Sequence, residues 1–160
     1  MLKKDNVQFI IIGDGDLKEK YKRKLSSQDN IIFGPRIDNK DVPSLLSLCD
    51  ILYLSTFPSK VWEYGQSLNK MVEYMLAGKP IIASYSGLES MLNEAKCGVF
   101  VRTDTPSDLV NAIDDYAKLS KTKLEEIGKR GREWVIRNRH YAKLSNQYEN
   151  ELQNLLNNDQ

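Results

Sequence analysis

Short apolar runs rich in β-branched residues alternate along this chain with segments of helical periodicity, and no other feature restricts its fold as strongly. Runs of this kind, bounded by turn residues, are typical of buried strands. Because the runs are apolar on both faces and helical segments separate them, the pattern predicts a doubly wound α/β domain with a parallel sheet covered by helices. The predicted strands are residues 7–12, 31–33, 50–54, 81–84 and 98–101.

The segments between the strands carry the end signals of helices. Gly78 stands where a left-handed residue ends a helix, and Pro80 follows it. Thr105 is the expected N-cap of a later helix, with Pro106 at its first position. Helices are predicted at 17–25, 41–49, 67–77, 88–95 and 105–119, and two C-terminal helices follow at 122–139 and 141–156.

Composition excludes several classes of protein. The charges of the chain's 23 basic and 22 acidic residues nearly cancel, whereas a basic nucleic-acid binder or an acidic tail would carry a large net charge. Cys49 and Cys97 both have apolar neighbours, which favours buried free thiols and a reducing compartment over a disulfide. The N-terminus becomes charged at Lys3, unlike a secretory signal, and no apolar run approaches the roughly 18 residues that span a bilayer. We therefore expect a single cytoplasmic domain, since 160 residues suit one domain.

Ligands of such sheets bind at the carboxyl ends of the strands, where three of four predicted loops contain glycine. A loop of small residues before a helix lets backbone N–H groups approach a phosphate. Gly13 and Gly15 lie in the first of these loops, but Lys18 stands where a dinucleotide fingerprint would have its third glycine. A plain strand-to-helix turn, with Asp16 as the N-cap, explains this loop equally well.

The segment 64–80 carries a more specific signal. Asn69 and Lys70 fall in the first turn of its helix, and Lys70 shares a face with Glu73. A cation in the first turn opposes the helix dipole unless an anion is bound there. Glu73, one turn along, could then accept hydrogen bonds from two vicinal hydroxyls, as a carboxylate does with ribose. The alternative is an exposed Lys–Glu pair worth a few tenths of a kcal/mol.

These residues resemble the C-terminal, donor-binding domain of family-4 retaining glycosyltransferases of the GT-B fold. Most similar are bacterial enzymes that build capsule, O-antigen and other surface polysaccharides. The resemblance covers essentially the whole chain. Residues 7–15 resemble a strand and its glycine turn, residues 31–37 the next strand and the loop that packs on the base, and residues 67–84 the donor-binding helix and strand.

The resemblance implies roles for individual residues. Glu73 matches the second glutamate of the family's two-glutamate motif, which holds the ribose hydroxyls, and Gly65 stands where many members have the first. A branch of the family shares this departure, and in it Asn69 and Lys70 would face the diphosphate or the sugar. Which residue reads the donor sugar stays open. The predicted catalytic residues are Lys70 and Glu73, and the predicted donor-binding residues are Gly13, Gly15, Arg36, Ile37, Tyr64, Gly65, Ser67, Asn69, Lys70 and Glu73.

By the same resemblance, residues 1–160 form one nucleotide-sugar-binding domain that lacks the family's first C-domain strand and helix. The acceptor-binding N-terminal domain, with its catalytic histidine, is absent as well. We therefore expect little or no transferase activity from the isolated chain. We also expect an incomplete sheet, which either closes up or takes a strand from a partner in a strand-sharing oligomer.

The leading hypothesis is transfer of a hexosyl or N-acetylhexosaminyl group, with retention, from a nucleotide diphosphate sugar to a polysaccharide or lipid-linked glycan. UDP is favoured over GDP, and neither a metal nor another cofactor is expected. One alternative is a non-catalytic module that binds a nucleotide or a partner protein. Another is a GT-B-like sugar-nucleotide epimerase, which would need acid/base carboxylates and histidines in the cleft. The only histidine is His140.

The remaining features have structural explanations. His140 lies at the predicted break between the last two helices, where a hinge or surface role is expected. The basic residues of 118–143 indicate a solvated helix face, with peripheral contact to anionic lipid at the inner membrane face as the alternative. Trp134 and Val135 are predicted core residues. The segment 55–63 is either a flap over the donor sugar or an ordinary surface loop.

Overall fold

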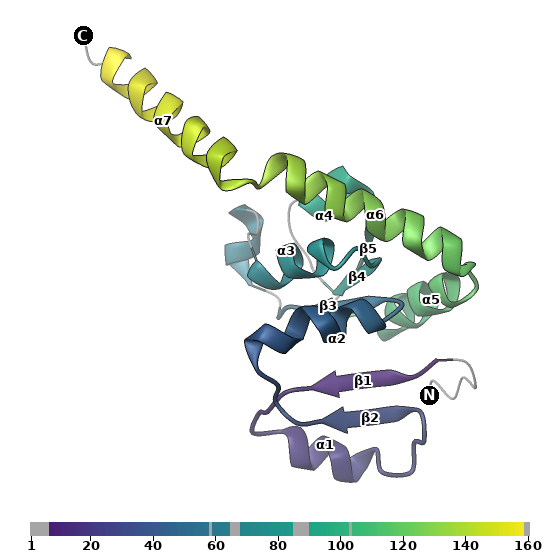
Figure 1. The fold of residues 1–160 in the computed structure, drawn as a ribbon. Coiled ribbons are helices and arrows are strands. Elements are labelled where there is room, and N and C mark those ends of the chain that lie inside the picture. Colours follow the sequence, from purple (N-terminus) through teal and green to yellow (C-terminus); the bar gives the residue numbers. More distant parts are fainter. Residues whose placement is uncertain (1–6, 58, 65–67, 85–89, 103, 159–160) are drawn as a thin grey trace.

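The computed structural model describes residues 7–57, 59–64, 68–84, 90–102 and 104–158, and it is an α/β fold (Figure 1). Every observed strand pairing is parallel. The strands are β1 (Phe9–Ile12), β2 (Ile31–Gly34), β3 (Leu52–Ser55), β4 (Ile81–Ser84) and β5 (Gly98–Val101). The α-helices are α1 (Lys18–Lys24), α2 (Val42–Leu48), α3 (Asn69–Leu76), α4 (Met91–Ala95), α5 (Pro106–Ala117), α6 (Lys121–Asn138) and α7 (Tyr141–Asn158), and the 3-10 helices are η1 (Asn39–Asp41) and η2 (Lys60–Tyr64).

The strands form two sheets, one of order β1-β2 and one of order β3-β4-β5. In the first sheet Phe9 lies opposite Ile31, and in the second Ile81 lies between Leu52 and Gly98. Figure 1 shows β1 on the side of its sheet that faces the other three strands, with α2 crossing between the two sheets. The predicted α/β class with parallel strands and C-terminal helices is confirmed.

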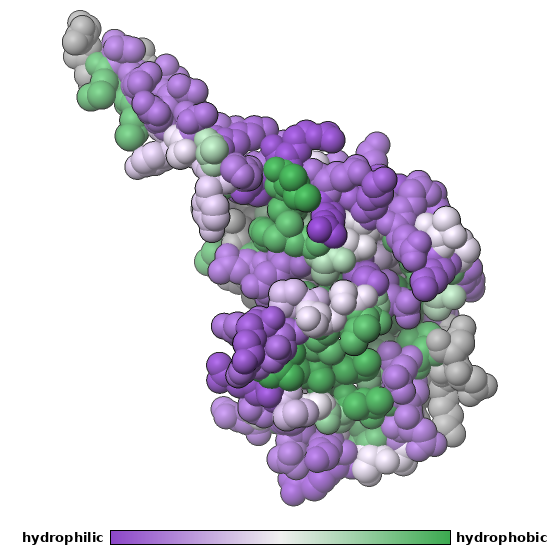
Figure 2. Space-filling view, viewed as in Figure 1, coloured by the Kyte–Doolittle hydropathy of each residue, from purple (hydrophilic) through white to green (hydrophobic). Residues whose placement is uncertain are grey.

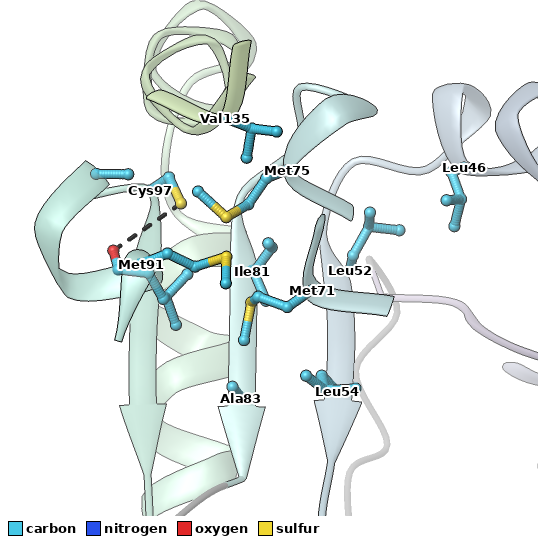
Figure 3. Close-up of a cluster of buried hydrophobic side chains, with 12 residues drawn as sticks. Leu46, Leu52, Leu54, Met71, Met75, Ile81, Ala83, Met91, Cys97 and Val135 are labelled. Atoms are coloured by element: carbon cyan, nitrogen blue, oxygen red, sulfur yellow. Dashed lines mark hydrogen bonds between the residues drawn. The ribbon is translucent and has the colours of Figure 1, made fainter. Parts of the chain in front are cut away.

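The hydrophobic core lies around the β3-β4-β5 sheet. Met71 and Met75 of α3 and Ile81 of β4 have no exposed surface. Figure 3 shows both methionines directed into the cluster, with Val135 of α6 beside them. Trp134 packs against this cluster as well, so its prediction as a core residue is confirmed.

Glycines allow α6 to pass directly over the end of α3. A Cβ on Gly128 would stand 1.9 Å from the carbonyl oxygen of Gly78, and a Cβ on Gly131 would stand 2.9 Å from Cys97. Gly78 itself has φ +68°, the left-handed conformation predicted for the residue that ends this helix. This close packing fixes α3 between the sheet and α6.

The β1-β2 sheet is far less buried. Ile10, Ile11 and Ile32 are 48%, 47% and 43% exposed. Figure 2 shows apolar side chains gathered on this part of the surface, next to α2. Among residues 7–45, Gly34 alone is buried.

The last helix leaves the body of the molecule. Figure 1 shows α7 extending away from it, and His140 lies at the break between α6 and α7, where the sequence predicted a hinge. Tyr141, Tyr148 and Leu155 on α7 are 90%, 68% and 62% exposed. Among the described residues, no helix is both long enough and apolar enough to span a membrane.

Several local predictions need correction. Asp16 is not the N-cap of α1, because that position is held by Leu17 with no side-chain hydrogen bond. Thr105 does hold the N-cap position of α5, but its side chain makes no capping hydrogen bond and its hydroxyl contacts Asp104 instead. The two cysteines are free thiols, as predicted, with Cys97 buried and Cys49 half-buried.

Candidate functional site

The carboxyl ends of parallel strands share one edge, and here that edge holds most of the predicted site. β1 ends at Ile12 opposite Gly34, and β3 ends at Ser55 opposite Ser84. From β1 to β2 the chain moves away from the other sheet, whereas β3, β4 and β5 follow one another in the opposite direction (Figure 1). Because ligands of α/β sheets bind where the strand order reverses, the expected crevice lies beyond the ends of β1 and β3.

Gly13 and Gly15 lie at the end of β1. Gly13 has φ +131°, a backbone conformation that residues other than glycine rarely adopt. A Cβ on Gly15 would meet nothing within 4 Å, so the turn is open to a ligand. A pocket of about 510 Å³ next to this turn is lined by Gly13, Gly15, Lys18, Tyr21 and Phe33 among others. The α1 helix has only seven residues, so this turn offers a small anion site at most.

Lys18 is a site residue that the sequence did not predict, because it stands out there only as the residue in place of a fingerprint glycine. Its ammonium donates to the carbonyl oxygens of Gly13 at 2.7 Å and Gly34 at 2.8 Å. It therefore joins the ends of β1 and β2. A cation five residues after the strand-ending glycine is the only sequence signal, and the spacing alone does not reveal the second carbonyl.

The loop after β2 contributes Arg36 and Ile37. Arg36 is exposed, and Ile37 is half-buried. They follow Gly34 directly, so they lie at the same edge as the Gly13 turn. The geometry leaves both side chains free to contact a flat ligand lying across the ends of β1 and β2.

The α3 helix presents Asn69, Lys70 and Glu73 on its exposed side, while Met71 and Met75 anchor the opposite side. Lys70 and Glu73 do not form the ion pair of the alternative interpretation, and in the described part of the chain neither side chain has a hydrogen-bond partner. These groups are therefore available to a ligand.

The first turn of α3 also has open backbone donors. Leu68 holds the N-cap position without a side-chain hydrogen bond, and its carbonyl accepts from Met71 at 3.0 Å. No described residue accepts from the N–H groups of Asn69 and Lys70. Two N–H groups and one ammonium at a helix start form a set that suits an anion.

The connection between β3 and α3 is described in part. Tyr64 ends η2 and is 88% exposed, whereas Gly65 and Ser67 lie outside the described residues. The indole N–H of Trp62 donates to the carbonyl oxygen of Phe57 at 2.8 Å, which folds this loop back on itself. At the base of the loop, the backbone N–H and the hydroxyl of Thr56 donate to the carbonyl of Ser84, tying it to the end of β4.

Tyr74 on α3 and Cys49 at the end of α2 are half-buried titratable residues that pack against the core. Burial raises the pKa of the Tyr74 phenol, and the neighbouring Cys49 and Glu73 raise it further. Burial also raises the pKa of the Cys49 thiol. Both groups therefore stay protonated at neutral pH, and neither is prepared to act as a base.

Other candidate surfaces lie away from this edge. A pocket of about 460 Å³ lined by Asn93, Lys96 and Arg130 is at the amino end of β5, opposite to the strand ends that hold the site. Three of the six basic residues of α6 form ion pairs within the helix, in Lys123–Glu126, Arg130–Glu126 and Lys129–Glu133. The choice between a solvated face and lipid contact stays a prediction.

Comparisons with known proteins agree on the fold. A family model described as glycosyl transferases group 1 matches residues 1–118. No curated protein matches the sequence. Among solved structures, sucrose-phosphate synthase from Thermosynechococcus elongatus has a TM-score of 0.71 at 20% identity, over 93% of this chain and 38% of that one.

Two further structures are similar to this chain. HepE of Anabaena, in complex with UDP, has a TM-score of 0.66 at 22% identity, over 94% of this chain and 42% of that one. WaaG, a glycosyltransferase involved in lipopolysaccharide biosynthesis, has a TM-score of 0.60 at 17% identity, over 80% and 33%. This chain thus spans less than half the length of each. At these identities the likeness shows the fold, which is that of a Rossmann-like C-terminal GT-B domain.

Proposed function

This chain belongs to the group 1 glycosyl transferases, and on that premise we propose that it is the donor-binding half of a family-4 retaining enzyme. The donor is a nucleotide diphosphate sugar, with UDP favoured over GDP. The transferred group is a hexosyl or N-acetylhexosaminyl residue. In support, HepE was solved both with UDP and with UDP-glucose.

The observation that carries this proposal is the exposed start of α3. The two N–H groups that have no acceptor among the described residues, together with the Lys70 ammonium, would bind the diphosphate, with the Asn69 amide beside them. Glu73 lies one turn further along the same exposed side. A carboxylate there would accept hydrogen bonds from both ribose hydroxyls. These hydrogen bonds are charge-assisted and therefore among the stronger ones.

The other predicted residues would surround this pair. Arg36 and Ile37 would flank the base from the loop after β2, and the turn at Gly13 and Gly15 would pass close to the nucleotide. Tyr64, Gly65 and Ser67 would lie toward the sugar, because they precede the helix start in the chain.

The role of the donor-binding half in the reaction would be to stabilise the leaving nucleotide diphosphate. As the glycosidic bond breaks, negative charge grows on the diphosphate, and donors already aimed at it lower the barrier. Lys70 and the N–H groups supply this charge stabilisation from the protein, so we expect no metal requirement. Acceptor activation would come from an N-terminal domain, so we expect the 160-residue chain alone to bind donor without transferring sugar.

Titration of the chain with UDP, GDP and NAD tests the proposal. UDP should bind most tightly, and Glu73→Ala should raise its dissociation constant roughly tenfold or more, the usual size for hydrogen bonds to a charged group. Glu149→Ala on α7 is the matched control, because Glu149 is also exposed and lies on another helix. Equal UDP affinity in wild type and Glu73→Ala would count against the site.

Two other functions predict different results. A non-catalytic module would bind nucleotide but would not gain transferase activity when an N-terminal partner domain is added. An epimerase is disfavoured by the location of His140, which lies at the α6–α7 break and not among the strand ends. Transfer assays with and without an added N-terminal domain separate the half-enzyme from the non-catalytic module, and clear turnover by the chain alone would contradict the proposed half-enzyme.

The cellular context extends the proposal. An acceptor that is a surface polysaccharide or a lipid-linked glycan would place the protein in the cytoplasm, at the inner membrane face.

The separate β1-β2 and β3-β4-β5 sheets support strand sharing with a partner, because β1 is paired only with β2 in the described residues and keeps Ile10 and Ile11 half-exposed. A sedimentation measurement tests this point, and a monomer at all concentrations would contradict it.

A further inference from the structure

Lys18 is bound to the protein itself through all three of its donors. Its Nζ atom lies 2.7 Å from the Gly13 carbonyl oxygen, 2.8 Å from the Gly34 carbonyl oxygen and 3.1 Å from a carboxylate oxygen of Asp14. Its side chain is 21% exposed, whereas that of Asp14 is 66% exposed. An ammonium has three N–H donors, so these three contacts use them all.

This saturation separates Lys18 from Lys70, although both lie in the first turn of a helix. The Lys18 charge is offset by Asp14, and no donor is left for a phosphate. Lys70 is exposed and has no partner among the described residues. The two lysines therefore suit different tasks, and only Lys70 suits direct contact with an anion.

The two carbonyls that Lys18 holds belong to the loops expected to receive the base. Gly13 is the turn residue with φ +131°, and Gly34 precedes the exposed Arg36 and half-buried Ile37. Few apolar contacts fix these loops, because Gly34 alone is buried among residues 7–45. The β1-β2 ladder ends where Ile12 pairs with Gly34. The Lys18 ammonium, shared by the carbonyls of Gly13 and Gly34, is therefore the restraint that continues beyond the ladder into the two loops.

We propose that Lys18 is a positioning residue that fixes the loop of Gly34–Ile37 against the turn at Gly13, and thereby sets the width of the base-binding surface without touching the ligand. The proposal rests on the proposed nucleotide-binding function. Without the ammonium, the loop samples several positions and only a fraction of molecules is ready to bind. Apparent affinity falls in proportion to that fraction.

The test compares Lys18→Met with wild type, using UDP as the probe at two salt concentrations. Lys18→Met should raise the UDP dissociation constant about tenfold, as expected if a tenth of the molecules hold the bound conformation. Its salt dependence should match wild type, whereas Lys70→Met should show a weaker one, because only Lys70 meets the diphosphate. Lys18→Arg should recover part of the affinity, and Asp14→Asn, which keeps an acceptor oxygen, should change it less than about twofold.

A measurement without ligand keeps the two proposals separate. In Lys18→Met the backbone order parameters of Arg36 and Ile37 should fall from about 0.85 toward about 0.6, while those of β4 stay unchanged. Unchanged order parameters, or a reduced salt dependence in Lys18→Met, would overturn the positioning role. If wild type fails to bind UDP, the proposed function is wrong. The order parameters still test whether Lys18 positions the loop. If Lys18→Met does not fold, Lys18→Gln takes its place with the same expectations.

Discussion

The two halves of this domain are held together by different forces. In the half built from β3, β4, β5, α3 and α6, a continuous apolar cluster includes Met71, Met75 and Ile81, all without exposed surface. In the half built from β1, β2 and α1, isoleucines stay half-exposed and the ends of the two strands are joined by Lys18. The first half is held mainly by burial, and the second by the β1-β2 ladder together with the Lys18 contacts at its end.

The difference decides how each part of the candidate site responds to change. Lys70 and Glu73 project from a helix whose opposite side is anchored in the core, so they can be replaced with little effect on folding. The loop at Arg36 and Ile37 follows Gly34, whose carbonyl accepts from Lys18, so by our proposal this one side chain controls the geometry of the loop. Four experiments test this difference between the two halves.

The largest effect is expected from Gly128→Ala. The added Cβ would stand 1.9 Å from the Gly78 carbonyl oxygen, which is backbone and cannot move aside cheaply. We expect a loss of about 3 kcal/mol or more in the free energy of unfolding, the upper range for overpacking. Gly15→Ala, in open space at the end of β1, should change it by less than about 0.5 kcal/mol. Urea denaturation measures both free energies, and equal losses would contradict the difference in packing between the two halves.

Alkaline pH should weaken the core through Cys97. Burial raises the pKa of its thiol to about 11 from the ordinary 9.0, so the folded state holds the proton more tightly than the unfolded chain. The resulting stability is complete below pH 9.0 and is lost as the pH rises through about 11. The loss is on the order of 2–3 kcal/mol. Unfolding curves across this range should fall more steeply for wild type than for Cys97→Ser, and parallel curves would contradict the argument.

Replacement of Lys70 should affect binding but not folding. Lys70→Met removes an exposed ammonium that has no partner among the described residues, so the free energy of unfolding should change by less than about 0.5 kcal/mol. UDP affinity should fall about tenfold, which corresponds to about 1.4 kcal/mol. Calorimetric titration and urea denaturation of the same samples measure the two quantities. A destabilised variant with normal UDP affinity would contradict the assignment.

The smallest effect is expected from Ile32→Thr on β2, where the side chain is 43% exposed. Its loss of stability should stay below about 1 kcal/mol, because much of the apolar surface is already in water. The matched variant is Ile82→Thr on β4, where the side chain is 1% exposed and the loss should reach about 2 kcal/mol or more. Similar losses at both positions would mean that the β1-β2 half is as well packed as the other.

Much of the fold followed from local patterns. The strands at 81–84 and 98–101 were predicted with their observed bounds, because each is a buried apolar run between turn residues. The third strand, predicted at 50–54, is Leu52–Ser55, and the helix predicted at 67–77 is Asn69–Leu76. The ends shifted because capping and loop contacts set them, and local propensity does not fix these contacts.

The candidate site could be predicted less completely. Spacing alone placed Lys70 and Glu73 on one face of a helix, and the structure leaves that face exposed. The choice between an ion pair and a ligand site needed coordinates, because three-residue spacing permits contact without requiring it. The roles of Gly65 and Ser67 stay predictions, since they lie outside the described residues.

Periodicity over neighbouring residues was enough to predict the α/β class, the order of the elements and the helix face that carries Lys70 and Glu73. The division of the strands into two sheets, the packing of α6 against Gly78 and the contact of Lys18 with Gly34, 16 residues away, are visible only in the three-dimensional structure. Such contacts join residues distant in the chain, and their energies depend on burial and on angles between elements. No local pattern encodes those quantities.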